Sequence, residues 1–544
     1  MKNFDFQKLI FITLIIFEFF LLIVSSFKNS MTFDEIVYAP AGLSYLEKRD
    51  FRLNLEHPPC GKYLLSIPLY IFGFKGDYES QFFKEQNQIK FGKNFYFEKG
   101  NLKALNISRF VTIFITIIFS ISVYLFVLKI FGKGCAIFSL IFFILYPDTI
   151  AHGSLATTDM FFSFFFFLSI CFFYFFLKNF KNKYLFLTAI FSSFTILTRH
   201  QGLFLFPFYF LILFYNLIKR KISFKKVLVF SLIFIIFLYS FIWIFYFFKS
   251  YVYLKGTEKK LWLLPSAYVN GIFVSKNLIS KRLSFFLGEI QTKNSKIFYI
   301  FSFFLKTPIS IIILLFLSPF FKIFDKTKFF LFSFFFFFLI SSIISPVSSH
   351  RYILFIYPFV FIISSIVSIE LMKKNWDKIF LFILISFNIY SFFRFFPYPL
   401  SYVNEFIKKD KAYFYFVDSN LDWGQGLIAL KKYIEKEKID EIYLSYFGTA
   451  KPKYYGINFI PLPSYYQELY NPEDYPKEIF VEKDKFLAIS ITNLVGLYQP
   501  NYFVDFIDIK RPEKIIGGSI YIYKSKRDVK FEFQENSPLR WRIK

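Results

Sequence analysis

The amino-acid sequence predicts a polytopic α-helical membrane protein whose last part forms an α/β domain. Apolar residues make up 56% of the 544 residues and charged residues only 19%, below the ~25% typical of soluble domains. The apolar residues come in uncharged runs such as 161–177 and 227–248. At ~1.5 Å per residue, runs of this length match the ~30 Å hydrocarbon core of a bilayer. A soluble cytosolic enzyme is therefore excluded.

About eleven apolar segments are expected to cross the membrane. The first, residues 9–27, follows a short basic start and is not closed by a small-residue cleavage site, so we expect an uncleaved span rather than a signal peptide. The other spans are expected at residues 105–131, 134–150, 157–177, 184–198, 200–218, 227–248, 297–321, 328–345, 351–372 and 379–396. The sequence TRHQG at residues 198–202 interrupts the pieces around 184–218, which makes them the least regular.

The basic charge follows the membrane topology. The net charge is +27, from 65 basic and 38 acidic residues, and nearly all of the excess lies before residue 397. A basic chain could bind nucleic acid, but these lysines concentrate in short loops between apolar runs, such as 178–183, 219–226 and 373–378. This positive-inside pattern places those loops in the cytoplasm, so no nucleic-acid partner is expected. The loops 28–104, 147–157 and 249–296 then fall on the opposite side, and an odd span count places the C-terminus there too.

Residues 397–544 are expected to form a second, extracytoplasmic domain after a membrane domain of residues 1–396. Short β-type runs occur at residues 413–417, 442–447, 486–492 and 519–523. An amphipathic stretch at residues 427–438 lies between the first two runs. This order predicts a βαβ start and hence a small α/β domain.

The composition offers little for a dedicated metal site. The three cysteines form no CxxC pattern and no disulfide framework, and there are only four histidines. We therefore predict no metal ligands and no cofactor. A single divalent ion is compatible with the sequence but is not required.

Polar residues cluster at the outer ends of the apolar segments. They are Asp34 and Glu35, residues 56–62 with His57 and Lys62, Asp148, residues 152–159, Arg199, His200, Lys306 and residues 350–352. Each has a structural explanation on its own, because carboxylates cap helices, arginines anchor helices at the interface and a lysine can extend to the surface. Together they bring acidic groups and several cations to one face of one bundle, where ionisable residues are functional candidates. A carboxylate base among cations suits a phosphate leaving group.

Six motifs, which contain most but not all of these residues, follow in order along the chain. They are FDE at 33–35, EHPPCGKYL at 56–64, AHGSLATTDM at 151–160, LGEIQTKNSKIFYIFSFFLKTP at 287–308, HRYILFIYP at 350–358 and DSNLDWGQGL at 418–427. In these motifs the sequence resembles the GT-C superfamily of membrane glycosyltransferases. It is most similar to the protein O-mannosyltransferase-like family (glycosyltransferase family 39) and its bacterial relatives. It departs from the family pattern at Cys60, where a small aliphatic residue is usual, and at Gly426, where an acidic residue is usual.

The resemblance implies a fold and an activity. The fold is a transmembrane bundle whose first outer loop, 28–104, carries two membrane-parallel helices, expected near 34–48 and 58–74. The activity is transfer of a sugar from a polyprenyl-phosphate carrier on the non-cytoplasmic face, with inversion at the anomeric carbon. This reaction generally needs no divalent metal in the family.

The resemblance and the clustering together give the candidate site residues. The catalytic candidates are the acidic residues Asp34, Glu35 and Asp159, of which Asp34 maps to the general base of the family. The candidates for holding the donor phosphate are the basic residues His57, Lys62, Arg199 and Arg351.

The sequence thus predicts a glycosyltransferase of a bacterial-type inner membrane, with a hydroxyl-bearing protein, lipid or glycan as acceptor. No Walker A or well-placed GxGxxG pattern occurs, which agrees with a donor other than a nucleotide sugar. Two alternatives remain open: a transporter or flippase of a lipid-linked glycan, and a non-catalytic scaffold for cell-envelope assembly. Transporters favour mid-membrane sites and internal repeats, and the sequence has its polar groups at one face and no evident repeat.

Overall fold

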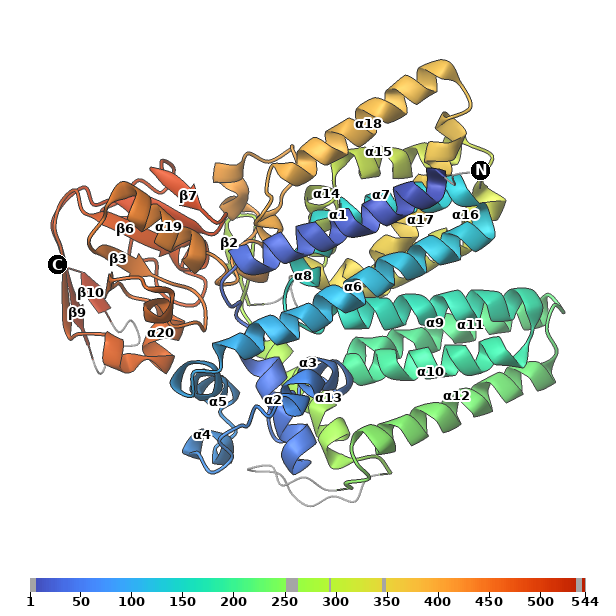
Figure 1. The fold of residues 1–544 in the computed structure, drawn as a ribbon, viewed down its shortest axis with the longest axis horizontal. Coiled ribbons are helices and arrows are strands. Elements are labelled where there is room, and N and C mark those ends of the chain that lie inside the picture. The colour runs from blue at the N-terminus through green and yellow to red at the C-terminus, as the bar shows by residue number, and fades with distance from the viewer. Residues whose placement is uncertain (1–5, 251–262, 293–294, 345–348, 535–540, 544) are drawn as a thin grey trace.

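A bundle of long helices and a region rich in β-sheet lie at opposite ends of the molecule (Figure 1). The computed structural model describes residues 6–250, 263–292, 295–344, 349–534 and 541–543. Part of the predicted outer loop 249–296 lies outside the described residues. The predicted fold class, a polytopic helical membrane protein with a C-terminal α/β part, is confirmed.

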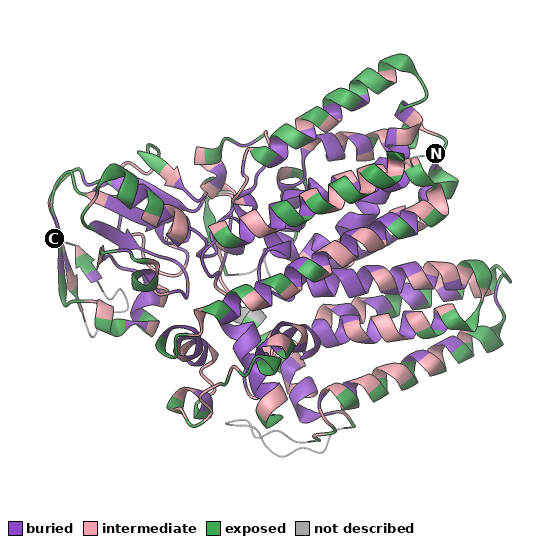
Figure 2. Ribbon diagram, viewed as in Figure 1, coloured by how far each residue is buried: buried purple, intermediate pink, exposed green. Residues whose placement is uncertain are grey.

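Among the described residues, eight helices are long and apolar enough to cross a membrane. They are α1 (Phe6–Lys28), α6 (Leu102–Phe131), α9 (Asp159–Asn179), α11 (Leu205–Ile218, after a 3₁₀ turn at His200–Phe204), α12 (Phe224–Phe245), α16 (Phe324–Ile344), α17 (Tyr357–Leu371, after a 3₁₀ turn at His350–Ile356) and α18 (Asn375–Phe393). Helix α17 is buried on nearly all sides, whereas α12 and α18 present exposed apolar side chains, as lipid-facing helices should (Figure 2).

Two bent helix pairs raise the count in the described chain to ten segments. They are α7 (Lys133–Ile144) with α8 (Pro147–Gly153), bent by 65°, and α14 (Phe298–Lys306) with α15 (Ile309–Leu317), bent by 108°. The second bend falls at Thr307-Pro308, because proline supplies no N–H and disfavours helical backbone in the residue before it. The break leaves Lys306 as the last residue of α14, buried beneath the outer face.

The remaining predicted segment, 184–198, forms α10 (Asn182–Thr198), which packs along α9. Its 17 residues extend about 26 Å at ~1.5 Å per residue, slightly less than the ~30 Å hydrocarbon core. All eleven predicted apolar segments are therefore helical in the described chain, and α10 is the one that is short for a full span.

The loop 28–104, predicted to be the first outer loop, contains helices α2 (Glu35–Lys48), α3 (Cys60–Ile71), α4 (Gln81–Lys84) and α5 (Gln88–Lys93). Helices α2 and α3 approach closely at Gly42, where an added Cβ would lie 2.4 Å from the Lys62 carbonyl oxygen. The Ser66 hydroxyl donates to the Ala39 carbonyl at 2.9 Å across the same contact. Helix α13 (Ser266–Lys281) and the hairpin β1 (Ser284–Phe286) and β2 (Glu289–Gln291) come from the later outer loop.

The C-terminal region contains two sheets. The larger has the order β4-β3-β6-β8-β7, with β3 parallel to both β4 and β6 and the rest antiparallel, and the smaller is the antiparallel sheet β10-β9-β5. The strands are β3 (Ile442–Ser445), β4 (Phe459–Pro461), β5 (Glu478–Val481), β6 (Phe486–Ser490), β7 (Lys514–Ile516), β8 (Ile520–Lys524), β9 (Val529–Phe533) and β10 (Trp541–Ile543). Three helices accompany them: α19 (Leu427–Glu437), α20 (Tyr465–Tyr470) and α21 (Ile491–Leu494).

One predicted strand is wrong. Residues 413–417 form the end of a 3₁₀ turn, Lys409–Phe414, and irregular backbone, so the domain does not begin with a βαβ unit built on them. The aromatic residues of this run make tertiary contacts instead. The Phe416 ring lies 6.0 Å from the Phe298 ring of the bundle, and the Tyr413 ring lies 6.2 Å from the Tyr521 ring of β8. Helix α19 precedes β3, and the parallel pairs form later in the chain.

We predict that the C-terminal region lies outside the cytoplasm. In Lys436→Cys, an exposed position on α19, the thiol should react with a membrane-impermeant maleimide in intact cells. In the control Lys221→Cys, in a basic loop between α11 and α12, it should react only after lysis, because positive-inside loops are cytoplasmic. The native cysteines Cys60, Cys135 and Cys171 are buried and should give little background. The reverse labelling pattern would contradict the topology.

Candidate active site

A buried ion pair between Glu35 and Arg109 fixes the chain after α1. The Arg109 guanidinium donates five hydrogen bonds: to both carboxylate oxygens of Glu35 at 2.7 and 2.6 Å, and to the carbonyls of Ser26, Asn29 and Ser30 at 2.6, 2.9 and 3.0 Å. Glu35 also accepts from the Thr32 N–H and hydroxyl and from the Ala156 N–H, at 2.8, 2.9 and 2.7 Å. Both side chains are almost fully buried.

The structure gives Glu35 a structural role, and a catalytic role for it stays a prediction. Its two oxygens accept five hydrogen bonds and have no exposed surface. Glu35 connects the start of α2, the middle of the bundle and the outer loop before α9. Sequence reasoning missed Arg109, although a lone arginine inside an apolar helix was a usable signal.

Asp34 faces the other way from its neighbour. Its Oδ2 accepts from the Tyr38 hydroxyl at 3.0 Å and from Arg351 Nη1 at 2.9 Å, and 20% of the side chain is exposed. Consecutive side chains at a helix start point in different directions, and here one carboxylate is buried while the other reaches a surface.

Asp159 and two arginines continue the cluster inward from Asp34. Arg351 Nη1 lies 3.7 Å from Asp159 Oδ2, and Arg199 Nη2 lies 2.8 Å from Asp159 Oδ1. Asp159 begins α9, Arg199 follows α10, and Arg351 belongs to the 3₁₀ turn before α17, so three spans converge here. All three side chains are nearly inaccessible. Buried charges are tolerated only when paired, and the alternation of two cations with two carboxylates provides the pairing.

Aromatic rings cover the two guanidinium groups. The Trp423 ring centroid lies 4.2 Å from the Arg351 guanidinium, and the Tyr352 ring lies 5.4 and 5.5 Å from Arg351 and Arg199. Desolvated contacts of this kind contribute about 0.5–2 kcal/mol each. They hold the planes of the guanidinium groups while leaving their edges available for hydrogen bonds.

Trp423 belongs to the DSNLDWGQGL motif, which the main chain ties to the loop before Asp34. Phe33 N–H donates to the Trp423 carbonyl at 2.9 Å, and Ser30 N–H donates to the Gln425 carbonyl at 3.0 Å. The Ser30 hydroxyl donates to the Gly424 carbonyl at 2.8 Å. The C-terminal region therefore helps to position both Asp34 and Arg351.

His57 lies beside this cluster, with its ring centroid 5.9 Å from that of Tyr38 and its Nε2 3.7 Å from Glu56 Oε1. Burial, together with the nearby cations Arg199 and Lys62, holds the pKa of His57 well below its ordinary value. The imidazole is therefore neutral at pH 7 and can form hydrogen bonds with a ligand but adds no charge. Burial, and then the charge of Asp34, raise the pKa of Glu56.

Lys62 is directed away from the carboxylates. Its ammonium donates to the Tyr45 hydroxyl at 2.9 Å and to the Asn54 carbonyl, and it is fully buried. Burial holds the pKa of Lys62 well below its ordinary value. In this structure Lys62 stabilises the α2–α3 loop, and its role in phosphate binding stays a prediction.

Lys306, predicted as a residue that could extend to the surface, does not do so. Its ammonium donates to the Asn420 and Leu400 carbonyls at 2.7 and 3.2 Å and lies 3.7 Å from Asp148. The Asn420 side chain in turn accepts from the His350 N–H at 2.8 Å. This buried network fixes the residue next to Arg351.

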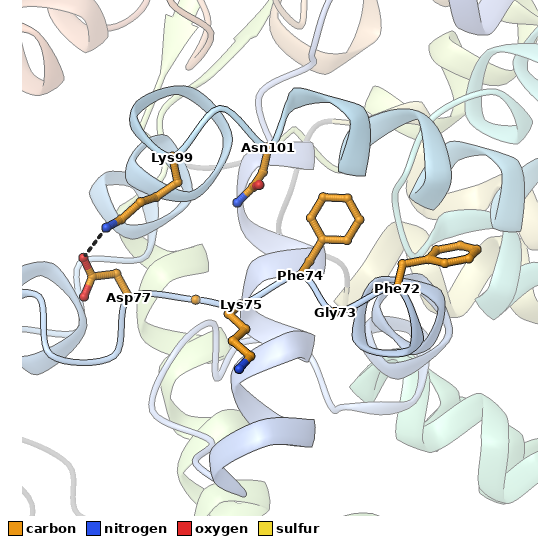
Figure 3. A pocket seen from close by; sticks show the side chains of 8 residues that line it. Phe72, Gly73, Phe74, Lys75, Asp77, Lys99 and Asn101 are labelled. Carbon is orange, nitrogen blue, oxygen red and sulfur yellow. Dashed lines mark ion pairs between the residues drawn. The ribbon is translucent and has the colours of Figure 1, made fainter.

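The open depression shown in Figure 3 is separate from the cluster. It has a volume of about 530 Å³ and is lined by Phe72, Gly73, Phe74, Lys75, Gly76, Asp77, Lys99 and Asn101, with an ion pair of 3.4 Å between Lys99 and Asp77. None of the predicted site residues lines it. In the described part of the chain, no group of three or more His, Cys, Asp or Glu side chains could hold a metal ion.

Residues 10–255 match the family model described as dolichyl-phosphate-mannose-protein mannosyltransferase. This confirms the resemblance over the part that contains Asp34, His57, Asp159 and Arg199. No curated protein sequence matches the chain.

The fold comparison gave matches to solved membrane enzymes, each 10% identical to the chain. ArnT from Cupriavidus metallidurans in the apo state matches with 94% of this chain and 97% of that chain covered, at a TM-score of 0.46. The same enzyme bound to undecaprenyl phosphate matches with equal coverage, at a TM-score of 0.42. The Archaeoglobus fulgidus oligosaccharyltransferase in complex with Zn and sulfate matches with 96% of this chain and 74% of that chain covered, also at 0.42.

We predict that Glu35→Gln destabilises the protein. Removing one charge of a buried pair leaves Arg109 uncompensated, which costs about 3–5 kcal/mol. The apparent melting temperature of the purified protein in detergent should fall markedly. The control Glu482→Gln removes the carboxylate of an exposed pair with Lys485 and should change it little. Equal melting temperatures for the two variants would show that Glu35 does not hold the fold.

Proposed function

We propose that the protein is an inverting membrane glycosyltransferase that moves a sugar from a polyprenyl-phosphate donor to a hydroxyl acceptor at the non-cytoplasmic face. The observation that carries the proposal is the partly exposed carboxylate of Asp34 bonded to Arg351, with Asp159 and Arg199 buried behind it. The matched family model describes enzymes that use dolichyl-phosphate mannose, which supports a polyprenyl-phosphate donor.

Asp34 is proposed as the general base. It accepts the proton of the acceptor hydroxyl while the acceptor oxygen forms a bond to C1 of the sugar. The bond from C1 to the phosphate oxygen breaks on the opposite side, and the polyprenyl phosphate leaves with the electron pair. A single displacement of this kind inverts C1, and a positioned base contributes about 10²–10⁴-fold in rate.

Arg351 and Arg199 are proposed to stabilise the leaving phosphate. A guanidinium group binds phosphate oxygens with two parallel hydrogen bonds. Asp159 lies between the two arginines and holds both in place. Arg351 also donates a hydrogen bond to the Asp34 carboxylate. When the donor phosphate takes over Arg351, Asp34 is released to accept a proton.

His57 and Lys62 supply the remaining groups of the proposed phosphate site. The neutral His57 ring lies near Tyr38 and can donate a hydrogen bond. Lys62, on α3, would need to leave Tyr45 or Asn54 to bind phosphate directly. No residue of this mechanism requires a divalent ion.

The cellular setting is part of the proposal. The site lies at the end of the spans next to the C-terminal region, which agrees with chemistry at a membrane surface (Figure 1). We place that surface outside the cytoplasm of a bacterial-type inner membrane, on the charge pattern of the loops. A transporter of lipid-linked glycans would bind the same donor, and transfer of a labelled sugar by the purified protein would separate the two functions.

One prediction concerns the proposed general base, Asp34. Asp34→Asn keeps the shape of the side chain but removes its basicity, so turnover should fall about 10²–10⁴-fold while donor binding is retained. The measurement is transfer of radiolabelled sugar from a polyprenyl-phosphate donor by purified variants. Asp50→Asn is the matched control, because Asp50 is a carboxylate of the same loop that pairs with Arg52 at 2.7 Å. An Asp34→Asn enzyme of normal activity would remove Asp34 from the mechanism.

Another prediction concerns binding of the donor phosphate by Arg351. Arg351→Lys replaces a bidentate group with a point charge and should weaken binding of undecaprenyl phosphate about ten- to hundred-fold, which corresponds to the ~1.5–3 kcal/mol of a hydrogen bond to a charged group. Titration calorimetry in detergent measures it. Arg394→Lys, at a pair with Glu405 of 3.1 Å, is the control and should bind normally. If Arg351→Lys bound undecaprenyl phosphate with unchanged affinity, Arg351 would have only a structural role in anchoring helices.

A further inference from the structure

Four aromatic rings form a wall beside Asp34 that the proposed mechanism does not use. We call Phe33, Phe447, Tyr466 and Tyr498 the aromatic wall. Phe33 stacks on Phe447 with ring centroids 5.6 Å apart, and Phe447 stacks on Tyr498 at 5.8 Å. Tyr466 meets Phe33, Phe447 and Tyr498 edge to face at 4.8, 5.5 and 5.3 Å. Phe447 is buried, whereas the other three rings are half-buried and keep part of their surface exposed.

The aromatic wall is fixed to the segment that carries the base. Phe33 directly precedes Asp34, and its N–H donates to the Trp423 carbonyl at 2.9 Å. Its carbonyl accepts from the Thr449 hydroxyl at 3.1 Å. A ligand stacked on the wall would therefore be held at a set distance from the Asp34 carboxylate.

Charged groups border the wall at Tyr498. The Tyr498 hydroxyl donates to Asp418 Oδ2 at 2.7 Å, and Arg282 Nη2 lies 3.6 Å from the same oxygen. The Arg282 side chain is 34% exposed and that of Asp418 is 15% exposed. Burial acts to lower the pKa of Arg282, but Tyr498, Asp418 and the more distant Asp34 raise it above its ordinary value. Arg282 thus lies at the border of the wall, next to Asp418.

This combination of groups has a specific chemical complement. One face of a pyranose ring is lined by C–H groups and stacks on aromatic rings, while its hydroxyls need donors and acceptors around the edge. An aliphatic chain could not form hydrogen bonds with Asp418 and Arg282. A peptide in extended conformation is bound chiefly through main-chain hydrogen bonds to a strand edge, and the wall consists of side chains.

We propose that the aromatic wall, with Asp418 and Arg282 at its border, is a saccharide-binding subsite. Calling the bound saccharide the acceptor rests on the proposed function. A hydroxyl of this saccharide then reaches Asp34, which takes its proton in the displacement described above. The acceptor is accordingly a glycan or the sugar headgroup of a glycolipid.

Binding can be tested without catalysis. Saturation-transfer NMR of the purified protein with methyl α-mannoside, maltose and N,N′-diacetylchitobiose should show transfer to ring protons of at least one sugar. Tyr466→Leu, which removes the stacking surface, should reduce that signal at least five-fold, and Asp418→Asn should reduce it too. Tyr466→Phe keeps the ring and should retain it. The control Phe480→Leu, a 54% exposed ring on β5 outside the wall, should bind as the unchanged protein does.

The outcomes separate the subsite from the enzymatic proposal. Asp34→Asn should bind the sugar normally although it does not transfer, so loss of transfer alone leaves the subsite intact. Equal signals in Tyr466→Leu and the unchanged protein, with unaltered melting temperatures, would show that the wall is packing only. Absence of a signal for all three sugars, or a signal only for a Ser/Thr-rich peptide, would overturn the proposal as well.

Discussion

The hydrogen-bonded pair of Glu35 and Arg109 is the constraint on which the outer face of the bundle depends. Helix α1 ends at Lys28, and a helix end leaves carbonyl groups without partners. Arg109 satisfies the carbonyls of Ser26, Asn29 and Ser30 from inside α6. The chain can therefore turn abruptly into α2 without exposing polar backbone to an apolar interior. Asp34 owes its direction to this turn, since the residue after it is held in place by five hydrogen bonds.

The C-terminal region is part of the site, although its fold is of another class. Trp423 lies over Arg351, and the carbonyls of the same motif hold the backbone before Asp34. Lys306 reaches across from the break between α14 and α15 to the Asn420 carbonyl. Cutting the chain near residue 397 would thus separate the proposed base and phosphate ligand from the groups that orient them. The predicted boundary between residues 1–396 and 397–544 marks a change in composition. It does not separate the site, because groups from both sides of the boundary hold Asp34 and Arg351.

The predictability of this protein differed between its parts for physical reasons. Helical spans depend on the length and apolarity of a local run, so each predicted segment could be read from the sequence. The motifs also located Asp34, Asp159 and Arg351, and the clustering of polar residues located Arg199. The structure brings these four residues into one chain of contacts. The different roles of Asp34 and Glu35 could not be predicted from their adjacent positions in the sequence. They depend on Arg109, which is 74 positions beyond Glu35. The strand predicted at 413–417 was wrong for a similar reason, because its aromatic residues make tertiary contacts: Phe416 packs on Phe298 of the bundle and Tyr413 packs on Tyr521.

In the proposed mechanism, the contact between Arg351 and Asp34 makes donor binding an exchange of anions. The guanidinium already has a carboxylate at 2.9 Å, so an arriving phosphate replaces one negative partner with another. The net affinity is then the difference between two strong interactions. Such a site discriminates against weakly binding anions. An anion that binds Arg351 less strongly than the Asp34 carboxylate does cannot displace that carboxylate. If the proposal holds, the selectivity of the phosphate site is set before the donor binds, by the same residue that is proposed to accept the proton.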